Sequence, residues 1–250
     1  MRILITAADR PQCARMVEKF VQKGHEVLAI GADREKLDAL VDRFGRQVKA
    51  VCVTNPASRV AISNAIASLP KAWRTIDVLI NNATLSLGNG LAHEASLEDW
   101  EAMIDANCST LVATTQAVLK EMLKRNTGTI LNLSAAREFS PTRGDNVFGA
   151  TVAFVHQYTL SLIESTVNTR IRVSCIAPDR LGKAELINLT TPRDDFASTQ
   201  QKRDFIPTDA DILDTIYWIA TLPEHINLNY LELAQTGELF SPRTVLQDGR

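Results

Sequence analysis

The chain has 250 residues, of which 45% are hydrophobic and 22% are charged, a length that favours one domain and a composition that excludes a disordered or low-complexity protein. The net charge is −2 at pH 7, and no run of basic residues could neutralise several phosphates, so we expect no nucleic-acid partner. No apolar run approaches the ~18 residues of a membrane span, so we expect no membrane partner.

Short apolar segments alternate with segments of helical periodicity along the chain, which is typical of repeated β-α-β units. Strands are expected at 2–6, 27–30, 48–53, 78–80, 128–133, 171–177 and 226–233. Helices are expected at about 11–23, 34–44, 59–68, 97–124, 146–165 and 208–222, and a long polar loop at 178–207. The pattern predicts an α/β fold, a doubly wound parallel sheet (Rossmann-like) in a single domain over residues 1–250, with any ligand at the carboxyl ends of the strands.

The cysteines and histidines carry no recognisable motif. The four cysteines are scattered without C-x-x-C spacing, and the four histidines are equally dispersed, so no metal site is predicted. The chain begins on an apolar strand rather than on a charged segment followed by a long apolar one, so we expect no export signal. Together these features predict a cytoplasmic protein with free thiols.

Several local sequences are diagnostic. Asn81-Asn-Ala83 follows the fourth strand, a helix containing Trp100 leads to Asn107, and the segments 146–154 and Thr221-Leu-Pro223 come later. With the order of the elements, these sequences make the whole chain resemble the short-chain dehydrogenase/reductase superfamily, most closely the branch that oxidises serine and other 3-hydroxy acids with NADP. The resemblance implies a glycine-rich loop for the cofactor and a catalytic tetrad of Asn, Ser, Tyr and Lys.

The glycine-rich loop is altered. Its family pattern, Thr-Gly-x-x-x-Gly-x-Gly, corresponds to Thr6–Cys13, where Ala7, Pro11 and Cys13 take the glycine positions. Glycine permits positive φ and lets phosphate approach the backbone, and proline also removes an N–H donor. Asp9 is either an ordinary cap of the following helix or a carboxylate that repels a pyrophosphate. The sequence therefore predicts no cofactor, with NAD(P) as the alternative.

Four weak candidates for cofactor contacts remain, namely Thr6, Asp33, Asn55 and Asn82. Asp33 stands where NADP-binding relatives have an arginine; it could accept a hydrogen bond from a ribose hydroxyl, or be an ordinary charge at the start of a helix. Asn55 replaces the acidic residue that often follows the third strand. Thr84 replaces the glycine of the family's Asn-Asn-Ala-Gly, which narrows the nucleotide site further.

Only Asn107 of the implied tetrad keeps its family residue. The serine, tyrosine and lysine positions hold Ala135, Phe148 and Val152, and losing a general acid alone typically costs ~10²- to 10⁴-fold in rate. Ser134 is offset by one residue, which turns it to the other face of the sheet. We therefore predict a catalytically degenerate protein (a pseudoenzyme) that acts as a binding or structural partner subunit. The alternative is an atypical NAD(P)-dependent oxidoreductase acting on a small hydroxy acid or carbonyl compound, with water or a loop residue transferring the proton.

The expected helix 146–165 carries almost no charge, and the expected helix 97–124 contains a mostly uncharged stretch with Leu111, Val112, Ala113, Val118 and Leu119. A helix lying on a sheet should instead show a polar stripe towards water. One face would cover the sheet, and the other, with Phe154, Tyr158 and Leu162, would need a second surface. The resemblance implies a four-helix contact between neighbouring copies. We predict a homo-oligomer, or a hetero-oligomer with an active relative; the alternative is a monomer whose long polar loop covers this face.

Overall fold

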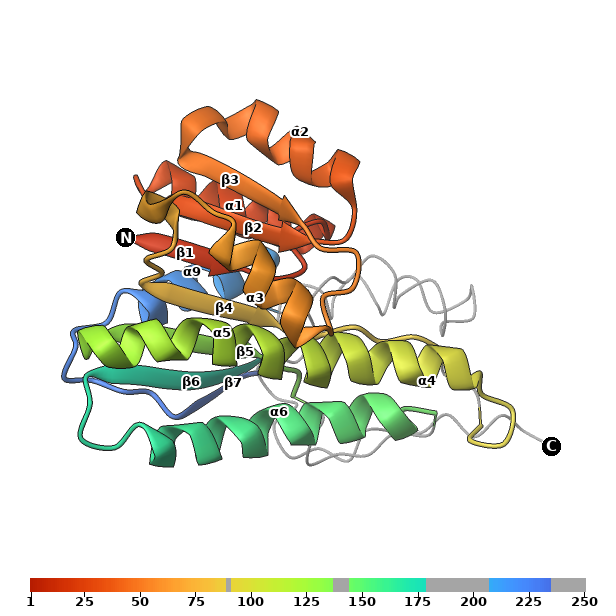
Figure 1. Ribbon diagram of the computed structural model, residues 1–250. Coiled ribbons are helices and arrows are strands. Elements are labelled where there is room, and N and C mark those ends of the chain that lie inside the picture. Colours follow the sequence, from red (N-terminus) through yellow and green to blue (C-terminus); the bar gives the residue numbers. More distant parts are fainter. Residues whose placement is uncertain (89–90, 137–143, 179–206, 235–250) are drawn as a thin grey trace.

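The protein forms one parallel sheet of seven strands, in the order β3-β2-β1-β4-β5-β6-β7 (Figure 1). The computed structural model describes residues 1–88, 91–136, 144–178 and 207–234. The strands are β1 (Arg2–Ile5), β2 (Glu26–Gly31), β3 (Val48–Cys52), β4 (Val78–Asn82), β5 (Gly128–Leu133), β6 (Ile171–Pro178) and β7 (Tyr230–Leu233). The predicted doubly wound, Rossmann-like sheet is confirmed, and the strand order reverses between β1 and β4.

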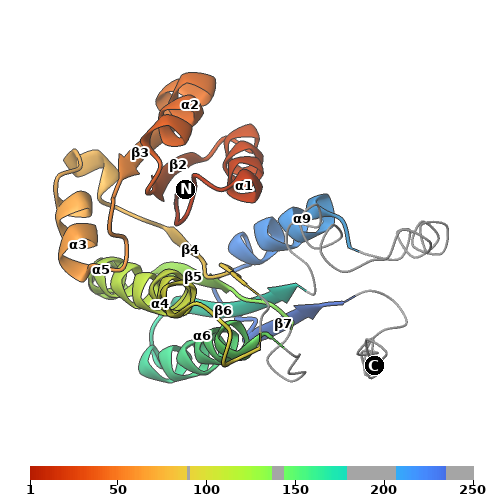
Figure 2. The ribbon, with the colours of Figure 1, turned by 90° about the vertical axis from the view of Figure 1, so that its right-hand side faces the viewer.

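Helices connect the strands and cover both faces of the sheet (Figure 2). They are α1 (Pro11–Gln22), α2 (Arg34–Phe44), α3 (Arg59–Ala67), α4 (Leu97–Ile104), α5 (Thr110–Arg125), α6 (Asn146–Ser165) and α9 (Asp209–Ala220). A π-helical turn, Asp105–Ser109, joins α4 to α5. Among the helices in the described residues, none is both long and apolar enough to cross a membrane.

Alternate residues of the strands supply two separate cores. In β1, Ile3 and Ile5 pack with α1, α2 and α9 on one face, and Leu4 packs with α3, α5 and α6 on the other. All three side chains are fully buried. This division follows from the period of two along a strand whose faces are both covered.

Two elements differ from the sequence prediction. The helix expected over 97–124 is divided by the π-helical turn at Asp105–Ser109. The last strand begins at Tyr230 rather than at 226, because the side chain of Asn227 takes the place of a strand there. Its Oδ1 accepts from Val173 N at 2.8 Å and its Nδ2 donates to Val173 O at 3.0 Å. The loop expected at 178–207 lies outside the described residues except at its two ends.

The side chain of Arg172 joins β6 to the end of α9, and we expect it to contribute to the stability of the fold. Its buried guanidinium donates to the carbonyls of Ile219 and Ala220 at 2.9 and 3.0 Å, and to Thr129 Oγ1 at 2.7 Å. We expect Arg172→Leu to lower the free energy of unfolding by about 3 kcal/mol in urea denaturation, since buried acceptors would lose charged donors. Arg170→Leu, which removes an exposed guanidinium 3.6 Å from Glu224, should change it little. Equal effects of the two variants would contradict this role.

Candidate functional site

The carboxyl ends of β1 and β4 bring together two of the predicted cofactor residues, Thr6 and Asn82. Thr6 is buried, and its Oγ1 accepts from the backbone N of Asn82 at 2.9 Å. The backbone N of Thr6 in turn donates to Ile80 O at 3.1 Å. Because the strand order reverses between these two strands, this is where a doubly wound fold binds its ligand.

The side chain of Asn82 holds this corner together. Its Nδ2 donates to Cys13 Sγ at 3.0 Å, and its Oδ1 accepts from Thr84 Oγ1 at 2.9 Å. Burial raises the pKa of the Cys13 thiol to about 12, so this sulfur is not a nucleophile near neutral pH. Cys13 at the last glycine position thus acts as a packing residue for the loop.

The loop after β1 keeps the backbone shape of a glycine-rich turn without its glycines. Ala7 has φ of +51°, a left-handed conformation that costs a non-glycine residue about 1 kcal/mol. The predicted helix cap at Asp9 is wrong, because α1 is preceded by Arg10 as its N-cap and no side chain caps it. Asp9 Oδ2 instead accepts from the backbone N of Ala32 and of Asp33, each at 3.0 Å.

Asp33 and Asn55 have structural explanations. Asp33 is the N-cap of α2, accepts from Lys36 N at 3.2 Å and pairs with Lys36 Nζ at 2.9 Å. The hydrogen bond with the Lys36 side chain lowers the pKa of Asp33, in agreement with a charge at the start of a helix. Asn55 is exposed in the turn before α3, where its carbonyl accepts from Ser58 N at 3.1 Å.

Asn107 lies in the π-helical turn and is fully buried. Its Oδ1 accepts from Leu85 N at 2.8 Å, and its Nδ2 donates to Leu85 O at 2.8 Å and to Thr151 Oγ1 at 3.0 Å. The amide therefore joins the segment after β4 to α6. A single-turn π-bulge is frequent at functional sites, and here it holds this amide against Thr151 of α6.

The other three tetrad positions lie together in an apolar cluster. Phe148 and Val152 are buried with Met103, and Ala135 packs against them. The fold thus gathers the positions that the resemblance implies, but these side chains carry no acid or base. The prediction that Ser134 turns to the other face of the sheet is wrong, because Ser134 is buried beside this cluster and its Oγ donates to Val152 O of α6 at 3.4 Å.

A buried polar network that the sequence did not predict lies between β4, β5, α5 and α6. Asn81 Nδ2 donates to Asn132 Oδ1 at 2.9 Å, and Asn132 Nδ2 donates to Thr159 Oγ1 at 2.9 Å. Thr114 Oγ1 donates to Asn81 Oδ1 at 2.6 Å. The signal was Asn81 in β4 and Asn132 in β5, each next to apolar residues that the sheet buries. Because its members come from β4, β5, α5 and α6, the network ties these four elements together.

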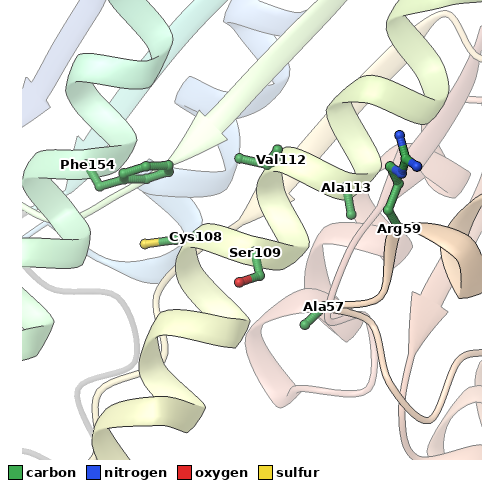
Figure 3. A pocket seen from close by; sticks show the side chains of 7 residues that line it. All are labelled: Ala57, Arg59, Cys108, Ser109, Val112, Ala113 and Phe154. Atoms are coloured by element: carbon green, nitrogen blue, oxygen red, sulfur yellow. The ribbon is translucent and has the colours of Figure 1, made fainter.

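A separate groove of about 430 Å³ lies over α5, between α3 and α6 (Figure 3). Its lining includes Cys108, Val112 and Phe154 and none of the four tetrad positions. Burial raises the pKa of the Cys108 thiol to about 11, which excludes a reactive thiolate near neutral pH. Among the residues that the structure describes, no three His, Cys, Asp or Glu side chains are grouped to hold a metal ion.

Comparisons with known proteins agree with this geometry. The family model for short chain dehydrogenase matches residues 1–186. The chain is 39% identical to the NADP-dependent 3-hydroxy acid dehydrogenase YdfG of Salmonella typhi, over 98% of this chain and 99% of that protein. It is 34% identical to the serine 3-dehydrogenase of Agrobacterium fabrum, over 96% and 95%. The closed form of serine dehydrogenase complexed with NADP+ superposes with a TM-score of 0.86 at 37% identity, over 98% and 99%.

These relatives correct two predictions. The expectation of no cofactor is contradicted, because the Salmonella relative is named NADP-dependent and the similar structure contains NADP+. The prediction of a catalytically degenerate protein is not supported either, since the relatives are named dehydrogenases and agree better with the oxidoreductase alternative.

The residues present fit a dinucleotide in part. The bond between Thr6 and Asn82 and the positive φ of Ala7 preserve the turn after β1. At the end of β2, where a doubly wound fold recognises the ribose, the carboxylate of Asp9 already holds the amides of Ala32 and Asp33. The site therefore fits a dinucleotide at the strand ends, but not a 2′-phosphate while Asp9 keeps this position.

Proposed function

Because the chain belongs to the short-chain dehydrogenase family, we propose that it is an atypical NAD(P)-dependent oxidoreductase that acts on a small hydroxy acid or carbonyl compound. The names of relatives at 39% and 34% identity, which act on 3-hydroxy acids and serine, support this proposal. One observation carries the proposal. The positions of the family's serine, tyrosine and lysine, Ala135, Phe148 and Val152, lie in one cluster. The side chain of Asn107 bonds to Thr151, the residue before Val152 in α6.

The residues at the tetrad positions limit the chemistry that this site can perform. A bound nicotinamide would supply the hydride chemistry. The side chains at Phe148 and Val152 are apolar and buried and offer no proton. The proton would therefore be exchanged with water, and we expect turnover ~10²- to 10⁴-fold slower than in relatives with the tyrosine and lysine.

A second candidate function is a non-catalytic partner subunit. It is favoured by one observation, namely that the side chains at the tyrosine and lysine positions, Phe148 and Val152, are apolar and buried. In this role the chain would stabilise an active relative in a hetero-oligomer. Binding of the cofactor would then add stability without turnover.

The test is an assay of the purified chain with NADP+ and serine or 3-hydroxybutyrate, and with NADPH and the corresponding carbonyl compounds. We expect slow, substrate-dependent change in nicotinamide absorbance. Asn107→Ser should remove most of it, because the amide positions the segment at Leu85 against α6. Asn64→Ser, which changes an exposed amide in α3, should not. A chain that binds NADPH but turns over none of these substrates would favour the partner subunit.

We further propose that the chain works in the cytoplasm. All four cysteines are free thiols, and two of them, Cys13 and Cys175, are buried. Free thiols persist in reducing compartments, where disulfides are rare.

A further inference from the structure

The end of β2 contains a small anion site that the protein fills with its own side chain. The backbone amides of Ala32 and Asp33 both donate to Oδ2 of Asp9 at 3.0 Å. Successive backbone amides that converge on one oxygen are a common way of binding an anion. In this chain the anion is a carboxylate 23 and 24 residues away in sequence.

Gly31 provides independent evidence that the carboxylate is fitted to this position. A Cβ added to Gly31 would lie 2.6 Å from Asp9 Oδ1 and 2.7 Å from its Cγ. Gly31 pairs with Cys52 in the regular register of β2 and β3 and does not have positive φ. Its backbone therefore does not need glycine, whereas the approach of Asp9 does.

The charges near Asp9 also do not favour the binding of a second anion, because the neighbouring ammonium of Lys36 already has a partner. Asp33 follows directly, and its carboxylate pairs with Lys36 Nζ at 2.9 Å. The pKa of Lys36 is raised by its hydrogen bond with Asp33, and Asp9 adds to this effect. Since this ammonium already pairs with Asp33, a further negative group gains less attraction from it.

We propose that Asp9 is a specificity-determining residue of the dinucleotide site, which occupies the amides of Ala32 and Asp33 in place of a 2′-phosphate. This inference rests on the proposed function. A doubly wound fold distinguishes NAD from NADP by the group it offers to the ribose near the end of β2. NADP therefore binds when Asp9 leaves these amides, and its apparent affinity falls with the fraction of molecules in that state. NAD, which carries a hydroxyl at this position, is penalised less.

The experiment measures binding rather than activity, by calorimetry on the full chain. The probes are NADPH and adenosine 2′,5′-bisphosphate, compared with NADH and adenosine 5′-monophosphate, which lack the 2′-phosphate. We expect Asp9→Ser to strengthen binding of the first pair by about tenfold or more, the size of one hydrogen bond to a charged group. Binding of the second pair should change much less. Asp38→Ser removes an exposed carboxylate from α2, the helix that Asp33 caps, and should leave all four affinities nearly unchanged.

A second variant displaces the carboxylate without removing its charge. Gly31→Ala forces Asp9 off the amides, so it should lower the melting temperature of the natural chain and have a smaller effect in the Asp9→Ser background. Asp9→Asn, which keeps an acceptor oxygen for the two amides, replaces Asp9→Ser if the latter does not fold. If Gly31→Ala lowers the melting temperature equally in the natural chain and in the Asp9→Ser variant, the contact between Gly31 and Asp9 is contradicted.

The outcomes separate this inference from the proposed function. Equal changes for NADPH and NADH, or no gain for either, would overturn the role of Asp9. NADPH-dependent turnover in the natural chain with no gain from Asp9→Ser would also overturn it, while leaving the oxidoreductase intact. A selective gain in NADPH binding without turnover would support Asp9 and contradict the oxidoreductase.

Discussion

The variant Ala135→Ser/Phe148→Tyr/Val152→Lys is expected to increase the turnover number with NADPH and a small carbonyl compound by about 10²-fold or more, because it restores a positioned general acid and its cation. The three positions already lie in one cluster. The change at Phe148 adds one hydroxyl to a ring that is 7% exposed. Assays at saturating NADPH separate this gain from any effect of Asp9 on affinity.

The matched control is Ala135→Ser/Phe148→Tyr/Val152→Met, which adds a side chain of similar length without the ammonium. Val152 is fully buried, so either substitution strains the packing, and thermal unfolding must first establish that both variants fold. The control should gain less, since an adjacent cation lowers the pKa of a phenol. A folded variant with Lys at position 152 that binds NADPH but is no faster than the natural chain would favour the partner subunit.

The fold was largely predictable, because its information is local. Apolar strands of four to eight residues, each followed by a helical segment, indicate a parallel sheet. The π-helical turn at Asp105–Ser109 was not predictable in this way, since the apolar pattern continues through one wider turn and no capping residue marks it. The late start of β7 depends on the side chain of Asn227 reaching a different strand.

The site was less predictable, because its contacts join segments distant in sequence. Asp9 stands where a helix cap is common, yet its partners are at the end of the neighbouring strand, and only the register of β1 and β2 brings them together. The absence of glycines predicted no cofactor, whereas Ala7 retains the positive φ that a glycine would supply. The side chains of the loop after β1 thus differ from the family pattern, whereas Ala7 keeps a glycine-like backbone conformation.

The outer face of α5 and α6 carries apolar side chains that nothing within the described residues covers. Val112 and Phe154 are 39% and 40% exposed and line the same groove. The ring of Phe154 stacks on Tyr158, with centroids 5.9 Å apart and 7° between the planes. The groove over α5 adjoins them (Figure 3). Leu162, predicted on this face, is instead buried in the core beneath α6, since its position on the helix faces the sheet.

We propose that this face binds a second copy of the chain. Glu164 is the one Asp, Glu, Lys or Arg residue in the 20 residues of α6, so a like surface can approach without burying an unpaired charge. In a two-fold symmetric dimer, the same surface patch of both copies forms the interface. The face formed by α5 and α6 would therefore contact the same face of the second copy. Stable interfaces of this kind bury about 2,000 Å² or more in total, and both helices contribute exposed apolar side chains to this face.

Light scattering at micromolar concentration is expected to give at least twice the chain mass of 27.5 kDa. Phe154→Glu and Tyr158→Glu should each reduce the mass to that of one chain, because a carboxylate would be buried against an apolar partner. Trp218→Glu changes an aromatic side chain that is 51% exposed on α9, on the opposite face of the sheet, and should leave the assembly intact. A natural chain that is monomeric and unchanged by Phe154→Glu would contradict the homo-oligomer. If it then forms a complex of two different chains with an active relative, and Phe154→Glu disrupts that complex, the same face serves a hetero-oligomer instead.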